Sequence, residues 1–311
     1  MATTTNITTT YAGKKAMPYL QAALLAPNTI RNGGVTVKPN IKFKQVLKKT
    51  AMSDLIKDGT CDYTPTATID ITENTLEPKE FQVNYTLCKQ DFRSDWDAIS
   101  MGLSAHDNLP PDLASFIIAK TAAEVATANE TIIWQGADAN EGEYDGFEAL
   151  FLADATVLDV AGTTGVTAAE AATIQAEMRK VIASIPQTIY GEEDVKLYVS
   201  SDVYRAYISS LAIQGGGDGY LNQGSNQGFS QLQFEGVNVF LANGLSAFKM
   251  VACQSSNLFF GTGLLSDQNE VSVLDMASLD GSQNVRFIMR YTAAVGYAYG
   301  AEIVNYIKAT V

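Results

Sequence analysis

The sequence predicts an α+β fold to which both sheets and helices contribute. Residues 284 to 295 alternate between apolar and polar side chains, which is typical of a strand with two different faces. Residues 109 to 135 carry apolar side chains at helical spacing, enough for one helix of about 25 residues. From about 150 to 260, signals for a helix, a strand, a helix and further strands follow in turn, which indicates a compact α+β subdomain.

The chain opens with a basic segment, and residues 1 to about 35 are expected to form an irregular arm. Residues 1 to 60 contain nine Lys or Arg against two Asp, a net charge of +7 in a chain whose total is −13, so the other 251 residues carry −20. This contrast favours an arm that lies against acidic surface, of its own chain or of a neighbour. A nucleic-acid-binding arm and a solvated arm remain alternatives.

Residues 41 to 52 and 66 to 88 are expected to form long strands of an extended hairpin, with polar turns at Asp58-Gly59 and Glu77-Pro78. Each face has too few apolar residues for an independent core, so the hairpin needs a partner surface. The apolar residues that alternate are Ala67, Ile69, Ile71, Phe81, Val83, Tyr85 and Leu87.

Leu109-Pro110-Pro111-Asp112 marks the start of the long helix, because proline and aspartate both suit a first turn. Gly136 marks its end. The predicted apolar stripe comprises Leu113, Phe116, Ile117, Ala123, Ala128 and Ile132, and the residues expected off it are Lys120, Glu124 and Glu130.

A second helix is predicted to begin at a capping box, Thr167 to Glu170, and to end at Pro186. A strand at Val195–Val199 and a helix led by Ser200 or Ser201 follow. Farther on, residues 270 to 276 should pair with the strand at 284 to 295, through a turn of positive φ at Asp280-Gly281. The nearly uncharged stretch after Arg290 is expected to be buried, by this chain or by a neighbouring subunit.

Little in the sequence points to chemistry. Cys61, Cys88 and Cys253 are expected to be buried or half-buried thiols, because their spacing fits neither a zinc site nor a disulfide framework. The only histidine, His106, lacks a nucleophile pattern, so we expect no catalytic site, no cofactor and no enzyme activity.

Two loops could be mistaken for ligand sites. The glycine-rich loop from Ile213 to Gly228 lies between a helix and strands, which is the wrong context for a phosphate cradle. The acidic loop at 138 to 145 lacks the EF-hand order, so a solvated turn is favoured over a metal site, although the sequence does not decide this. No apolar segment of about 20 residues or secretory signal is present, so no membrane span and a cytoplasmic site of synthesis are expected.

The order of elements in the last third resembles the C-terminal half of tailed-phage major capsid proteins of the Hong Kong 97-type fold. The segments that carry the resemblance are Gly219-Tyr220-Leu221, Leu232 to Val239, Asn257 to Gly261 and Val285 to Ile307. The resemblance implies an N-terminal arm at 1–40, an extended loop at 41–95, a peripheral domain with a spine helix at 96–148, an axial domain at 149–264, and a peripheral sheet with C-terminal strands at 265–311.

What the resemblance implies about function is a virion shell protein, self-assembling into pentamers and hexamers around double-stranded DNA without reading its sequence. Implied partners are a separate scaffolding protein, a portal protein and, as an open addition, decoration proteins, with assembly in the host bacterial cytoplasm. Some relatives cross-link a loop lysine, but no motif selects Lys48, Lys49 or Lys57 for that role. An encapsulin-type compartment shell and a phage tail or adhesion protein are the alternatives.

Overall fold

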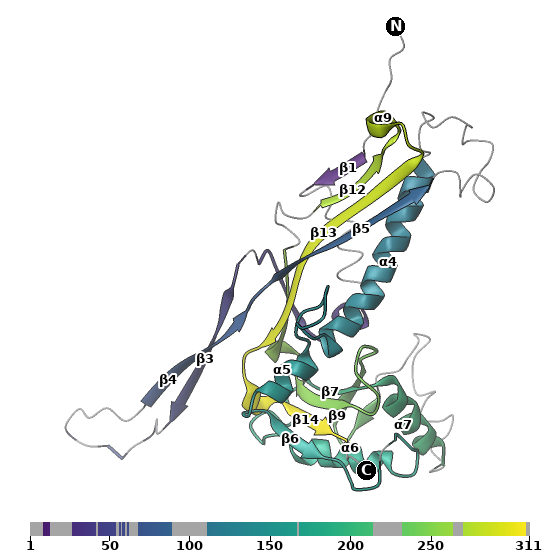
Figure 1. Ribbon diagram of the computed structural model, residues 1–311. Coiled ribbons are helices and arrows are strands. Elements are labelled where there is room, and N and C mark those ends of the chain that lie inside the picture. Colours follow the sequence, from purple (N-terminus) through teal and green to yellow (C-terminus); the bar gives the residue numbers. More distant parts are fainter. Residues whose placement is uncertain are drawn as a thin grey trace.

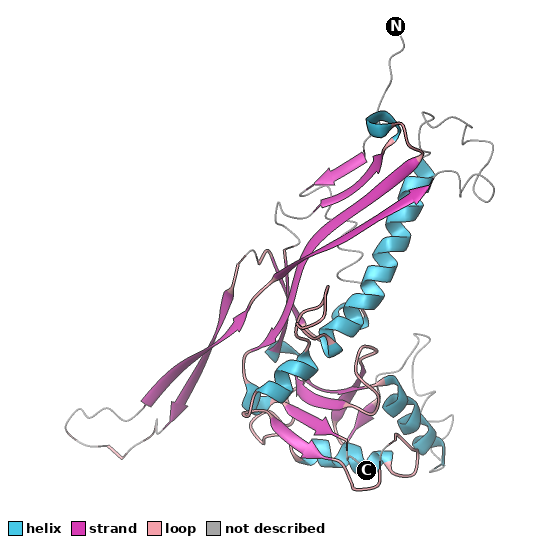
Figure 2. Ribbon diagram, in the orientation of Figure 1, coloured by secondary structure: helices cyan, strands magenta, loops and turns pink. Residues whose placement is uncertain are grey.

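A computed structural model describes eleven stretches of the chain, namely 9–12, 27–41, 43–53, 56, 58–59, 61, 68–88, 111–166, 168–213, 232–263 and 270–308. The molecule is elongated, with a first sheet backed by a long helix, a second lobe at one end, and a hairpin that projects sideways (Figure 1). Mixed helices and sheets were expected from the sequence, and the structure confirms them (Figure 2).

The first sheet has the strand order β1-β12-β13-β11-β2, with β5 on the other side of β13. Its strands are β1 (Thr9–Ala12), β2 (Thr36–Pro39), β5 (Lys79–Cys88), β11 (Leu258–Thr262), β12 (Glu270–Asp275) and β13 (Asn284–Tyr297). The antiparallel pairing of β12 with β13 confirms the prediction, and Gly281 adopts φ +73° after the short helix α9 (Ala277–Asp280) that joins them.

The long helix α4 (Pro111–Gln135) packs on this sheet and has the predicted bounds. Alternation places Tyr85 of β5 on the helix side, where its ring stacks on Phe287 of β13 at 4.9 Å and its hydroxyl lies 2.6 Å from Thr121 Oγ1. The predicted stripe is wrong at Ala123 and Ala128, which are exposed, and right at Ile132, which packs half-buried against the core. The side chains of Leu113, Phe116 and Ile117 lie outside the described residues. The buried apolar positions described in this helix are Ile118, Ala122, Val125, Ala126, Ile133 and Trp134.

The second sheet has the order β6-β14-β10-β7-β9-β8, and it forms the second lobe with three helices. The strands are β6 (Leu158–Ala161), β7 (Val195–Val199), β8 (Gln233–Phe234), β9 (Val237–Leu241), β10 (Met250–Gln254) and β14 (Val304–Ile307). The helices are α5 (Phe147–Ala153), α6 (Ile174–Ala183) and α7 (Ser201–Ile213). Short 3₁₀ turns are η2 (Ser255–Asn257) and η3 (Gly300–Glu302).

Several expected boundaries differ. The helix predicted from a capping box begins at Ile174, and the Glu170 carbonyl, not its carboxylate, accepts the first amides; Thr167 lies outside the described residues. The division at 264/265 is crossed in both directions, because β11 belongs to the first sheet and β14 to the second. Pairing with distant strands decides to which sheet β11 and β14 belong. Local periodicity in the sequence carries no information about that pairing.

The third sheet is the hairpin of β3 (Gln45–Ser53) and β4 (Thr68–Leu76). The predicted turn at Glu77-Pro78 is present, but β5, which was expected to belong to the hairpin, pairs with β13 instead. Proline explains the break, since it has no amide to donate to a continuing ladder.

Candidate assembly surfaces

A buried polar junction joins three distant segments at the end of α4. Glu130, only 6% exposed, accepts hydrogen bonds from the Thr29 amide at 2.9 Å and the Thr29 hydroxyl at 2.6 Å, and a longer one of 3.4 Å from the Gly244 amide. Trp134 Nε1 donates to the same Thr29 hydroxyl at 2.8 Å. We call Thr29, Glu130, Trp134 and Gly244 the junction.

The junction is tightly packed as well as fully bonded. A Cβ on Gly244 would lie 1.9 Å from the Glu130 carbonyl oxygen, and Gln135 Nε2 donates to the Gly244 carbonyl at 2.6 Å. Because the obstructing atom is backbone, this site accepts only glycine without rearrangement. The junction therefore fixes how the N-terminal segment, α4 and the second lobe meet.

The described parts of the arm include regular structure, where the sequence predicted an irregular segment. Residues 9–12 form β1 on the edge of the first sheet, and α2 (Asn28–Arg31) brings Thr29 and Ile30 into the core. Glu130, expected on the exposed side of the helix, is buried because α2 supplies its donors. The helical spacing of Glu130 with Ile133 and Trp134 is the sequence signal for the buried side of the helix at this position.

The hairpin has a root that packs on the body and an outer face that does not. At the root, Leu76 and Leu47 are buried, and Asn74 Nδ2 donates to the Tyr297 carbonyl at 3.0 Å. On the outer face, Ile69 is 56% and Ile71 68% exposed. Contiguous exposed apolar residues on one strand face mark an interaction surface more often than isolated ones do.

Charge on the outer face is paired across the strands. Lys48 and Glu73 lie opposite each other in the register, between exposed Val46 at one end and Ile71 at the other. We call Val46, Lys48, Ile69, Ile71 and Glu73 the outer face. Its mixture of aliphatic side chains and one charge of each sign suits a protein surface better than a polyanion, which would need a net positive face.

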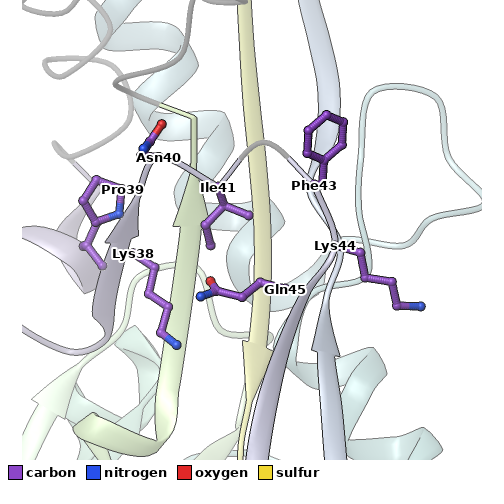
Figure 3. A pocket seen from close by; sticks show the side chains of 8 residues that line it. Lys38, Pro39, Asn40, Ile41, Phe43, Lys44 and Gln45 are labelled. Carbon is purple, nitrogen blue, oxygen red and sulfur yellow. The ribbon is translucent and has the colours of Figure 1, made fainter.

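A hollow of about 450 Å³ lies where the chain passes from β2 into β3 (Figure 3). Its two described lysines are already engaged, Lys38 over the Phe259 ring at 4.3 Å and Lys44 with Glu77 at 3.5 Å. Phe43 stands on the rim and is 80% exposed. Its described lining residues include no set of acid, base and nucleophile.

The acidic loop supports its own turn. Glu143 accepts hydrogen bonds from the Ala137 amide and Asn140 Nδ2, both at 3.0 Å, and these bonds hold the pKa of its carboxyl below the ordinary value. Asp145 accepts from the Asp138 amide, and Lys79 pairs with Asp138. Within the described stretches, no three His, Cys, Asp or Glu residues are grouped to hold a metal ion.

The remaining residues considered as site candidates are the three cysteines, His106 and the glycine-rich loop. Cys253 is buried and Cys88 half-buried, as expected, but Cys61 is exposed near the hairpin tip, so that expectation was wrong; all three are free thiols. His106 and the glycine-rich loop at 214–231 lie outside the described residues. Among the helices that are described, none is long and apolar enough to cross a membrane.

Comparison with known structures shows the fold that this chain shares. The capsid of the native GTA particle is 14% identical with a TM-score of 0.58, over 93% of this chain and 91% of that one. A chain of the satellite phage P4 procapsid that includes the size determination (Sid) protein is 12% identical with a TM-score of 0.56, over 95% and 98%. The capsid of cyanophage P-SCSP1u is 12% identical with a TM-score of 0.54, over 89% and 87%.

The sequence itself matches no protein-family model and no curated protein. At identities this low, the likeness establishes the fold, which is a mixed helix-and-sheet fold found in phage capsid structures.

Proposed function

We propose that this chain is a capsid protein, the major shell subunit of a tailed bacteriophage with the Hong Kong 97-type architecture. One observation carries the proposal: a projecting hairpin with an uncovered aliphatic outer face belongs to a fold shared, over nine-tenths of the chain, with capsid structures. An exposed apolar strand face promotes aggregation of a monomer, whereas in an assembly it forms a contact with a neighbouring subunit.

On this proposal the β3–β4 hairpin is the extended loop, α4 the spine helix and the second lobe the axial domain. Copies would assemble into pentamers and hexamers, each copy covering the hairpin of its neighbour. The proposed partners are further copies, a separate scaffolding protein and a portal protein, with packaged DNA enclosed but not read. The role is structural, and no catalytic residue is proposed.

Electron microscopy of the purified full-length protein tests the proposal. Closed shells with five-fold and six-fold capsomers, alone or with the neighbouring scaffold gene co-expressed, are the expected result. Tubes or fibres would favour a tail protein instead. Shells encoded beside an enzyme cargo gene, without terminase and portal genes, would identify a compartment and reject the phage assignment.

A further inference from the structure

A fully buried leucine lies where the hairpin joins the first sheet. Leu76, the last residue of β4, is fully buried in a small apolar cluster of its own. Ile41, Leu47 and Ala294 complete this cluster, which is separate from the two large cores. The chain turns at once after Leu76, so this side chain lies at the pivot between hairpin and body.

Two glycines make the space that Leu76 fills. A Cβ on Gly261 of β11 would lie 2.8 Å from Leu76 Cδ2 and 2.9 Å from Ile41 Cδ1. A Cβ on Gly296 of β13 would lie 3.2 Å from Leu76 Cδ1. Gly261 pairs with Ala294, two residues from Gly296, so both glycines lie on the same face of the sheet.

Backbone conformation does not explain these glycines. Neither has the positive φ that favours glycine, unlike Gly281 or Gly236. What both positions lack is a side chain, and the atoms a Cβ would meet belong mainly to Leu76, with Ile41 beside Gly261 and Leu47 beside Gly296. The two glycines with Ala294 therefore form a socket shaped for one leucine.

Among the described residues, the root also has buried Leu47 and polar contacts at its periphery. Asn74 donates to the Tyr297 carbonyl, and Lys49 Nζ lies 5.5 Å from the centre of the Tyr299 ring. Neither contact resists a tilt of the hairpin as a buried side chain wedged between two strands does.

We propose that Leu76, seated between Gly261 and Gly296, sets the direction in which the hairpin leaves the body. The second half of this inference rests on the proposed function: the socket also sets the angle at which the hairpin meets a second copy. Leu76, Gly261 and Gly296 are positioning residues, and they need not touch the partner.

The experiment measures hairpin direction in the unassembled full chain. Spin labels are placed on Cys61 near the tip and on α4 through Lys120→Cys, in a Cys88→Ser background; Lys120 is exposed and Cys253 is buried. Gly261→Ala should move terminal methyl groups by about 1 Å, and the nine-residue ladder should amplify that into a tip shift of about 4 Å. Gly296→Ala should shift the distance less, since its Cβ approach is longer.

Two controls separate positioning from damage. Gly59→Ala, at a site with nothing within 4 Å, should leave the distance unchanged. Adding Leu76→Val to Gly261→Ala removes the clashing methyl and should return the distance toward the wild-type value. A folded Gly261→Ala protein with an unchanged distance, or a shift that Leu76→Val does not suppress, overturns the proposal.

Particles assembled from the same variants test whether the socket sets the angle of contact with a second copy. Altered diameter or broken curvature with Gly261→Ala, reversed by Leu76→Val, is expected. Normal particles despite a shifted hairpin would overturn the link to the contact angle. If the wild-type chain forms no shell, the proposed function is wrong. The distances between the spin labels would still show whether the socket sets the direction of the hairpin.

Discussion

The junction at the end of α4 and the outer face of the hairpin differ in whether the chain covers its own side chains. At the junction, the chain buries a carboxylate and supplies every partner from its own segments, 101 and 114 residues away in sequence. On the outer face, Ile69 and Ile71 are left exposed, and so are the other described side chains of that face. The difference teaches that this chain completes the contact between its lobes by itself and leaves the outer face of its hairpin uncovered, where the proposed function places a second copy.

The energetics of the two regions differ accordingly. Buried donors that lose their acceptor cost about 1–3 kcal/mol each, so the junction should dominate the stability of the free chain. An exposed isoleucine adds little until a partner covers it, when burial contributes about 1.5–3 kcal/mol per side chain. Junction variants should therefore change unfolding, and outer-face variants should change assembly.

The largest effect is expected from deleting residues 1–35. The deletion removes Thr29, Ile30 and Val35 from the core and removes the main hydrogen-bond donors to Glu130. We expect a loss of at least about 5 kcal/mol in the free energy of unfolding. Urea denaturation measures it, with deletion of residues 1–12 as the comparison, since α2 then remains. Equal stability of the two truncations would contradict the assigned role of α2.

Glu130→Ala should come next, with a loss of about 3 kcal/mol, because three donors lose one buried acceptor. The matched control on the same helix is Glu124→Ala, where the side chain is exposed and a change within about 0.5 kcal/mol is expected. Equilibrium unfolding of both variants checks this pair. If the two losses are the same, the junction does not stabilise the chain as described.

A second buried carboxylate, Glu177 in α6, shows whether the chain supplies such partners in the second lobe too. Burial opposes its ionisation, but hydrogen bonds from Thr163, Tyr306 and Lys180 outweigh burial and hold its pKa below the ordinary value. Such a group stabilises the fold above its unfolded pKa of about 4.3, and this contribution is lost as pH falls through the folded pKa.

Glu177→Gln should therefore cost about 1–2 kcal/mol near neutral pH and lose less further stability on acidification than the wild type does. Unfolding free energies at a series of pH values from 6 to 3 provide the comparison. Parallel pH curves for the two proteins would show that Glu177 does not contribute to acid sensitivity.

The smallest effect on the free chain is expected at the outer face. The double variant Ile69→Thr with Ile71→Thr keeps β-branched residues, so the melting temperature should hardly change. Assembly, followed by light scattering, should fall sharply, because each copy loses apolar contact at the same surface. Val304→Thr, at a fully buried position of β14, is the reverse control and should lower the melting temperature. Unimpaired assembly of the double variant would mean that no neighbour covers this face.

Sequence periodicity and turn residues predicted those helices and strands whose bounds depend on neighbouring residues alone. The bounds of α4 and β7, and the inward face of Phe81, Val83, Tyr85 and Leu87, follow from periodicity and turn residues. The hydrogen-bond partner of Glu130 could not be read in this way, because it is a threonine about a hundred residues earlier. Strand β14 likewise joins β6 and β10 by long-range pairing that its own four residues do not announce.

The socket at the hairpin root shows the same limit. Gly261 and Gly296 look like ordinary strand glycines in the sequence, and only the position of Leu76, from a strand far away in the chain, explains them. The outer face was partly foreseeable, since the alternation at Ile69 and Ile71 indicated two faces. Which face the body would cover depended on how the hairpin leaves the sheet.

Amide hydrogen exchange, compared between the free chain and assembled particles, tests the central claim most directly. The amides of Thr29 and Gly244, which are bonded to Glu130, should be protected in both states. Amides in the distal part of the hairpin, Lys48 to Ser53 and Thr68 to Glu73, should exchange quickly in the free chain and become protected in particles. Equal protection of the distal hairpin in both states would contradict the claim that a second copy completes it.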